Sequence, residues 1–218
     1  MPFAKVGDQR LHVFVTLLVT IVLSIMVIPL FLPDSVHLAV ARLLTATTLL
    51  LALWAAGLRP RTLLFFVPIL IGYLVALEIG GQLRPLATSI RLVFIGYSTI
   101  LIIRHAVRAQ KVTADTIAGA ACAYVLAAIA WATMYELLES LRPGSFDIPA
   151  TWLLPPTRDP SFALIYFSFT TLTTVGYGDI HPLSVGAGGL AIGEAVVGQL
   201  YVAIMIARLV SLQLVERS

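Results

Sequence analysis

Charged residues are scarce in this chain. Asp, Glu, Lys and Arg make up 11% of the 218 residues, and hydrophobic residues make up 59%. An ordinary soluble domain has roughly 25% charged residues, so a soluble globular protein is excluded. Cysteine is also rare: Cys122 lies inside an apolar run, where we expect it to pack as a small hydrophobic group, and it says nothing about the redox compartment. The composition predicts an integral membrane protein.

Several signals for other classes of protein are missing. The net charge is +3, but the 14 basic residues are scattered at the ends of apolar segments instead of forming a stripe, so no nucleic-acid partner is expected. The first apolar run is long enough to stay in the bilayer, so no cleaved signal peptide is expected. The histidines have no metal-ligand spacing and no catalytic set is found, so neither an enzyme nor a cofactor is predicted. The histidines are His12, His37, His105 and His181.

Six apolar runs are long enough to cross a bilayer, which needs about 20 residues per helix. The breaks between them carry turn chemistry, such as Pro33-Asp34-Ser35 and Arg59-Pro60-Arg61. The predicted fold is therefore an all-α integral membrane protein with six transmembrane helices. The runs cover residues 11–32, 37–58, 62–82, 86–103, 112–138 and 183–213.

The distribution of basic residues predicts the orientation, because cytoplasmic loops carry an excess of Lys and Arg. With a cytoplasmic amino terminus, nine basic residues lie inside and three outside, so both termini are expected in the cytoplasm of a multi-pass protein. Compactness and alanine richness favour a bacterial inner membrane as the cell membrane concerned. The inside set is Lys5, Arg10, Arg59, Arg61, Arg104, Arg108, Lys111, Arg208 and Arg217, and the outside set is Arg84, Arg142 and Arg158.

A short apolar run, Phe162 to Leu172, lies between the fifth and sixth predicted crossings. Asp159 followed by Pro160 is a good helix start, because the carboxylate accepts at the cap and proline needs no N–H partner in the first turn. A helix of about 12 residues spans roughly 18 Å, about half a bilayer. We therefore predict a re-entrant pore helix.

The residues after this helix predict an ion-binding path. Irregular backbone at membrane depth is tolerated where it lines a water-filled path, and rings of backbone carbonyls can replace the hydration shell of K⁺. Turning successive carbonyls toward one axis needs unusual dihedral angles, which Gly176 and Gly178 adopt at little cost. Val175 and Tyr177 would then point away from the axis, and the Thr174 hydroxyl would add a further ring of ligands.

This stretch resembles the potassium channel family, whose filter signature Thr-Val-Gly-Tyr-Gly is intact at 174–178. The likeness covers about 112–213, whereas the first four helices resemble the six-helix channels in number and arrangement only. The resemblance implies a homotetramer, because one chain supplies one filter loop, with K⁺ in the filter as the only bound metal. It also implies that Tyr166, thirteen residues before Asp179, supports the filter through a hydrogen bond to that carboxylate, with packing of the pore helix as the alternative.

The resemblance places a glycine hinge at Gly198, nineteen residues after the filter aspartate. Gln199, Val202 and Ile206 would then line the cavity. Close helix packing is the alternative role for this glycine, because small residues let membrane helices approach.

Four ionisable residues stand out inside the predicted crossings. Glu194 is costly to bury unless it is paired or neutral, and it is predicted to have a structural partner or to act in gating. Arg42, Glu78 and Arg91 lie at similar depth and are predicted to form a static ion cluster with Glu78 between the arginines.

The fourth predicted helix has Arg91 as its one basic residue within the membrane, whereas a voltage sensor carries several. We therefore predict a voltage-sensor-like but non-sensing domain at 1–110 and a pore domain at 111–218, without a cytoplasmic ligand-binding domain. The predicted function is passive, K⁺-selective conduction by a homotetramer. A weakly voltage-dependent channel and a non-conducting accessory subunit are the alternatives.

Overall fold

The described part of the chain is almost entirely helical. The computed structural model describes residues 3–27, 31, 46–48, 50–51, 54, 72–73, 83–153 and 159–217. Its elements are α1 (Phe3–Val22), the π-helix η1 (Leu23–Val27), α5 (Arg84–Arg108), α6 (Ala114–Leu141), β1 (Phe146–Asp147), the 3₁₀ helix η3 (Ala150–Trp152), α7 (Ser161–Leu172), β2 (His181–Pro182) and α8 (Val185–Arg217).

Within these described ranges, three helices are long and apolar enough to cross a membrane: α5, α6 and α8. They overlap the predicted crossings at 86–103, 112–138 and 183–213 to within a few residues, so these three are confirmed as apolar helices of membrane-spanning length. The apolar part of the first predicted crossing, Leu11–Met26, is a shorter helix. The second and third predicted crossings lie largely outside the described residues, so the count of six stays a prediction.

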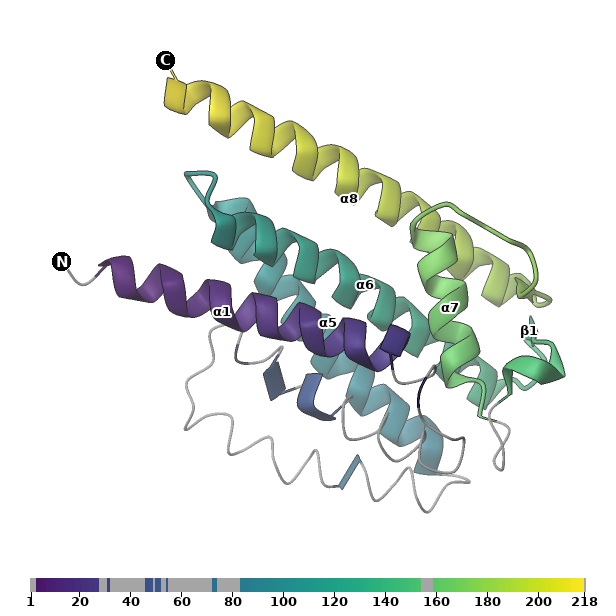
Figure 1. Cartoon of the computed structure of the whole chain (residues 1–218). Coiled ribbons are helices and arrows are strands. Elements are labelled where there is room, and N and C mark those ends of the chain that lie inside the picture. Colours follow the sequence, from purple (N-terminus) through teal and green to yellow (C-terminus); the bar gives the residue numbers. More distant parts are fainter. Residues whose placement is uncertain are drawn as a thin grey trace.

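Helix α6 contacts each of α1, α5, α7 and α8 (Figure 1). Its small residues allow this: a Cβ at Gly119 would lie 3.3 Å from the ring of Phe14 on α1. Phe14 and Leu17 are buried there against Cys122 and Leu126 of α6. Close approach over small residues is the usual way in which membrane helices associate, and here it makes α6 the centre of the bundle.

The start of α6 has a side-chain cap. The Thr116 amide donates to Thr113 Oγ1 at 3.2 Å, which satisfies one of the free N–H groups of the first turn. Farther along the chain, Tyr201 of α8 donates its hydroxyl to the Ala120 carbonyl at 2.7 Å, and Arg208 donates to the Ala109 carbonyl at 3.0 Å. The later half of α8 therefore lies along the first half of α6, antiparallel to it.

Helix α7 is inclined to the long helices at the end of the bundle where β1 lies (Figure 1). It packs against both α6 and α8. The antiparallel pairing of Phe146 with Pro182 and of Asp147 with His181 joins the segment after α6 to the segment before α8. The chain therefore leaves the end of α6, passes through α7 and the following loop, and returns to the same end of the bundle.

Candidate functional site

The start of α7 is held by Asp159. One carboxylate oxygen accepts from the Ser161 amide at 2.9 Å, the Ser161 hydroxyl at 2.6 Å and Arg84 at 2.8 Å. Burial acts to raise the pKa of Asp159, but the Arg84 charge and the Ser161 hydrogen bonds outweigh it and hold the pKa below its ordinary value. The prediction was wrong by one residue: Pro160 takes the N-cap position and α7 begins at Ser161. The Asp159 carboxylate still accepts from the first amide of the helix, and through Arg84 it also ties α7 to α5.

The other end of α7 is held at Leu172. Its carbonyl oxygen accepts from the Tyr124 hydroxyl of α6 at 3.1 Å. The same oxygen would lie 2.6 Å from a Cβ placed on Gly198, so α8 can approach the end of α7 this closely only with glycine at that position. Gly198 is thus a packing glycine in this structure, and its role as a hinge stays a prediction.

The loop after α7 has an alternating backbone. Thr174, Gly176 and Gly178 have φ of 60°, 55° and 80°, whereas Val175 and Tyr177 between them do not have positive φ. Glycine adopts such values freely, but a β-branched threonine does so at a cost of roughly 1–3 kcal/mol. The amides of Val175 and Gly176 both donate to the Thr170 carbonyl, at 2.8 and 3.1 Å, which helps to hold the loop in this conformation.

Aromatic rings brace the far end of the loop. Tyr166 donates its hydroxyl to Asp179 at 3.2 Å, and its ring stacks on Tyr177 at a centroid distance of 6.3 Å. The ring of Trp152 also stacks on the ring of Tyr166, at a centroid distance of 4.4 Å. The Ile180 amide also donates to the Asp179 carboxylate, at 3.1 Å. The aspartate is therefore bound to both α7 and the chain that follows.

The loop faces outward from the single chain. Residues 173–179 are all exposed, with Val175 at 53% and Tyr177 at 73%. Three residues of α8 predicted to line a cavity are exposed as well, namely Gln199, Val202 and Ile206. These positions thus have no cover within the described part of this chain.

Glu194 lies inside the bundle instead, fully buried on α8. It contacts two hydroxyls from different helices, Tyr135 of α6 and Ser168 of α7. It therefore connects the three helices that surround the loop.

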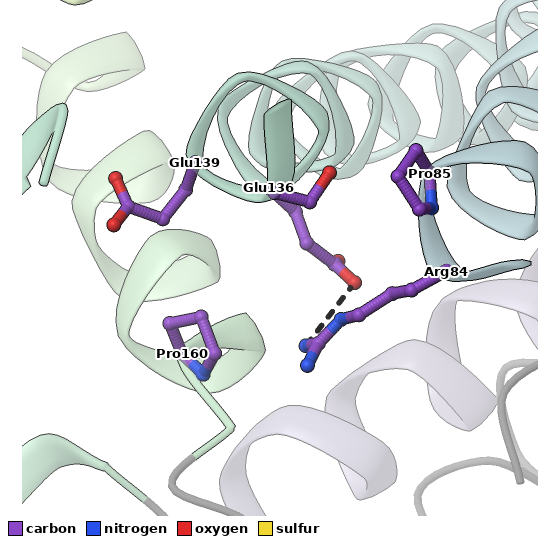
Figure 2. A pocket seen from close by; sticks show the side chains of 6 residues that line it. Arg84, Pro85, Glu136, Glu139 and Pro160 are labelled. Atoms are coloured by element: carbon purple, nitrogen blue, oxygen red, sulfur yellow. Dashed lines mark ion pairs between the residues drawn. The ribbon is translucent and has the colours of Figure 1, made fainter. Parts of the chain in front are cut away.

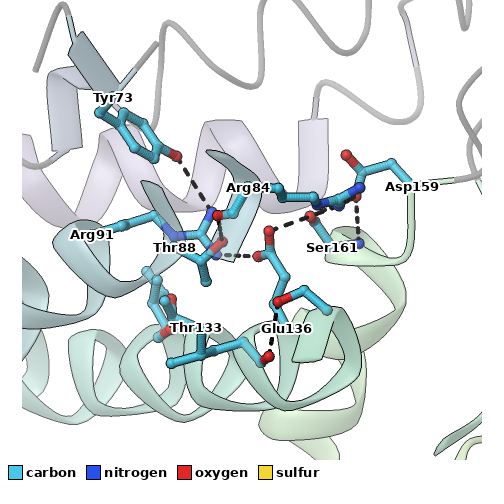
Figure 3. Close-up of polar contacts among 11 residues, drawn as sticks. Tyr73, Arg84, Thr88, Arg91, Thr133, Glu136, Asp159 and Ser161 are labelled. Atoms are coloured by element: carbon cyan, nitrogen blue, oxygen red, sulfur yellow. Dashed lines mark hydrogen bonds and ion pairs between the residues drawn. The ribbon is translucent and has the colours of Figure 1, made fainter. Parts of the chain in front are cut away.

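A second polar cluster joins α5 to α6 and α7 (Figure 3). Arg91 is paired with Glu136 of α6 and donates to the Tyr73 hydroxyl at 3.4 Å. Arg84 lies 3.8 Å from Glu136 and 2.8 Å from Asp159. We call Arg84, Arg91, Glu136 and Asp159 the charged cluster.

The charged cluster differs from the ion cluster predicted from the sequence. Arg42 and Glu78 lie outside the described residues, so their part in the predicted cluster is not described. Glu136 was missed by the sequence reasoning, although a carboxylate within the apolar run 112–138 is the same signal that singled out Glu194.

A cavity of about 260 Å³ adjoins the charged cluster, between the start of α5, the end of α6 and the start of α7 (Figure 2). Arg84 points toward Glu136 across it. Glu139 on its wall already accepts from three backbone amides, those of Gly144, Ser145 and Phe146. The carboxylates of Glu136 and Glu139 therefore already have partners, and the cavity is polar and large enough for water to fill it. Among the described residues, no three His, Cys, Asp or Glu side chains gather into a metal site.

Comparison with protein families identifies the region that contains α7, the loop and most of α8. Residues 157–213 match the family whose description is ion channel. No curated protein and no solved structure matches the chain. This segment is therefore similar to ion channels, which agrees with the resemblance to potassium channels found in the sequence. The match covers about a quarter of the chain, and the described helices α5, α6 and α8 are long and apolar enough for a membrane protein.

Proposed function

We propose that four copies of this chain form a channel selective for K⁺, with the backbone of Thr174 to Gly178 as its filter. The observation that carries the proposal is the left-handed backbone at Thr174, Gly176 and Gly178, within the ion channel segment. Residues with this φ at alternate positions let successive carbonyls turn to one side, as a ring of ion ligands requires. The strained Thr174 supports this, because backbone strain is typical of functional sites.

In this proposal α7 is a re-entrant pore helix. Its 12 residues correspond to roughly 18 Å, too short to cross a bilayer. Its last carbonyls precede the filter, and the negative end of the helix dipole favours a cation there. The hydrogen bond between Tyr166 and Asp179 supports a role for both residues in holding the filter.

The proposed assembly is a homotetramer in which the filter loops meet on one axis. Exposure of Val175 and Tyr177 on the single chain supports it, because neighbouring subunits would cover these side chains. Closed symmetry would also place Gln199, Val202 and Ile206 of α8 around a central cavity. Both termini lie in the cytoplasm in this arrangement, and ions pass without coupling to an energy source.

We further propose that the part before residue 111 does not sense voltage strongly. Arg91 is paired with Glu136, and Arg84 with Asp159, so both arginines of the first half of α5 are bound to the pore region. A weakly voltage-dependent channel is the second candidate, since one buried arginine could still move. The slope of conductance against voltage separates the two: a slope unchanged by Arg91→Gln favours the non-sensing reading.

The test is the reversal potential of the purified protein in a planar bilayer, with K⁺ on one side and Na⁺ on the other. Wild type is expected to reverse close to the K⁺ potential. In Gly178→Ala the selectivity is expected to be lost: a Cβ there meets no atom within 4 Å, so the change acts through the φ of +80°. Gly96→Ala on α5, also without a contact within 4 Å, is the matched control and is expected to behave as wild type.

Two outcomes would count against the proposal. Reversal of wild type near zero would mean a non-selective pore. Absence of current at every voltage tested would favour a non-conducting accessory subunit.

A further inference from the structure

The hydrogen-bond partners of Glu194 indicate the protonation state of its carboxyl group. Its side chain is fully buried, at a place where Gly193 allows close packing: a Cβ on Gly193 would lie 3.3 Å from the Trp131 ring of α6. Among the described residues, no Lys, Arg or His forms an ion pair with Glu194. The carboxyl group instead contacts the hydroxyls of Tyr135 and Ser168.

Four groups form a row of oxygen contacts across three helices. The row runs from the Tyr135 hydroxyl to Glu194 Oε2, from Glu194 Oε1 to Ser168 Oγ at 2.5 Å, and from Ser168 Oγ to the Ala128 carbonyl at 2.7 Å. The row has three oxygen–oxygen contacts, and each needs a proton between the two oxygens to be attractive.

The hydroxyls alone supply too few protons. Tyr135 and Ser168 have one hydroxyl proton each, and a backbone carbonyl has none. If Glu194 were ionised, two protons would serve three contacts, and either Glu194 and Ser168 or Ser168 and Ala128 would face each other with bare oxygens. A protonated Glu194 supplies the third proton, because it donates from Oε1 to Ser168, Ser168 donates to Ala128, and Tyr135 donates to Oε2.

We propose that Glu194 is a neutral carboxylic acid that positions α7 between α6 and α8. The acid accepts from Tyr135 of α6 and donates to Ser168 of α7, and Ser168 in turn donates to Ala128 of α6, so the acid holds α7 at a fixed distance from its two neighbours. Its consequence for ion selectivity rests on the function proposed above, whereas its protonation state does not.

The protonation state is tested by infrared spectroscopy of the purified protein at neutral pH. The difference spectrum of wild type minus Glu194→Gln is expected to contain the C=O stretch of a protonated carboxylic acid. Asp147→Asn is the control: it also replaces a carboxyl group by an amide, but Asp147 is 58% exposed, so its difference spectrum should lack the C=O stretch of a protonated carboxylic acid. A Glu194→Gln spectrum that matches this control would overturn the proposal.

The positioning role is tested with two substitutions of Glu194 in the same bilayer assay. Glutamine can donate to Ser168 and accept from Tyr135 as the neutral acid does, so the K⁺/Na⁺ permeability ratio should stay within about twofold of wild type. Leucine leaves the Tyr135 hydroxyl without its acceptor and breaks the link from α8 to Ser168, and the ratio or the tetramer yield should fall at least about tenfold. Equal losses in both variants would contradict the role. If wild type itself is not selective, the proposed function fails while the infrared result still decides the protonation state.

Discussion

Glu136 and Glu194 are both buried acids on packed helices, and the structure satisfies them in opposite ways. Glu136 is paired with Arg91 and lies near Arg84, so its charge is met by cations. Glu194 meets only hydroxyls among the residues that the structure describes, and its contacts require a proton on the acid. Burial alone therefore does not determine how an acid in this bundle is stabilised.

The position of each acid explains the difference. The charged cluster extends to the surface through Arg84, whose side chain is 29% exposed, so part of the charge remains in contact with solvent. Glu194 lies between α6, α7 and α8 with no exposed surface. A charge there would lose all its hydration, and neutralisation is the usual response of such a group.

The largest effect is expected from breaking the charged cluster at Glu136. Glu136→Leu leaves Arg91 as a buried charge without its partner, which typically costs about 3–5 kcal/mol. The free energy of unfolding in detergent, followed by circular dichroism during titration with a denaturing detergent, measures the loss. The double variant with Arg91→Leu should recover most of it, because replacing both charges by apolar groups is often nearly neutral. A double variant no better than the single one would show that the pairing is not what matters.

Removing one hydroxyl from the Glu194 row should cost less. Ser168→Ala leaves the donor of the acid without an acceptor, and a loss of about 1–3 kcal/mol is expected because no bare charge results. Thr133→Val is a suitable control, since the Thr133 hydroxyl bonds only to the Ile129 carbonyl of its own helix at 2.7 Å. The same unfolding measurement applies. A loss at Ser168 as large as that of Glu136→Leu would argue that Glu194 is ionised after all.

Much of this architecture could be predicted from the sequence. Length and apolar composition predicted α5, α6 and α8 to within a few residues, because a membrane helix satisfies its own backbone. The pair Asp159 and Pro160 predicted the start of α7 to within one residue, and this start depends on neighbouring residues only. The glycines of the loop predicted positive φ at 176 and 178 for the same local reason.

The rest depends on contacts between distant residues. The positive φ of Thr174 is the exception: it goes with short-range bonds from the Val175 and Gly176 amides to the Thr170 carbonyl, but threonine itself does not favour such a φ, so its residue type gave no signal. The pairing of Arg91 with Glu136 depends on how α5 packs on α6, which helix patterns do not specify. The proton on Glu194 follows from three helices meeting, so the sequence could say only that the acid was paired or neutral.

A smaller effect, the loss of stability at low pH, should distinguish the ionised Asp159 from the neutral Glu194. Because the pKa of Asp159 is lowered in the folded protein, its ionised form adds stability above the unfolded pKa of about 3.9, and this is lost as pH falls through the folded pKa. The unfolding midpoint of wild type should therefore fall at acidic pH, and Asp159→Asn should reduce that fall. Below the ordinary glutamate pKa of about 4.3, Glu194 is protonated in both the folded and the unfolded protein, so Glu194→Gln should leave this acidic limb unchanged. Above it the unfolded state ionises, so wild type should lose stability toward neutral pH and Glu194→Gln should remove that loss. A change of the acidic limb in Glu194→Gln would contradict its neutrality.

The smallest effect is expected at Arg84, the exposed edge of the charged cluster. Its bond to Asp159 is short, at 2.8 Å, but its side chain is 29% exposed, so solvent screens the pair. Arg84→Gln should cost only about 0.5–1 kcal/mol. The same measurement in high salt separates the two arginines. In 1 M salt, charges in solvent are screened over about 3 Å, so most of the difference in unfolding free energy between Arg84→Gln and wild type should disappear. The cost of Arg91→Gln should persist in that salt, because the Arg91 side chain is only 12% exposed and its partner 4%. Equal salt dependence of the two variants would mean that both arginines are solvated alike, and that the charged cluster has no buried half.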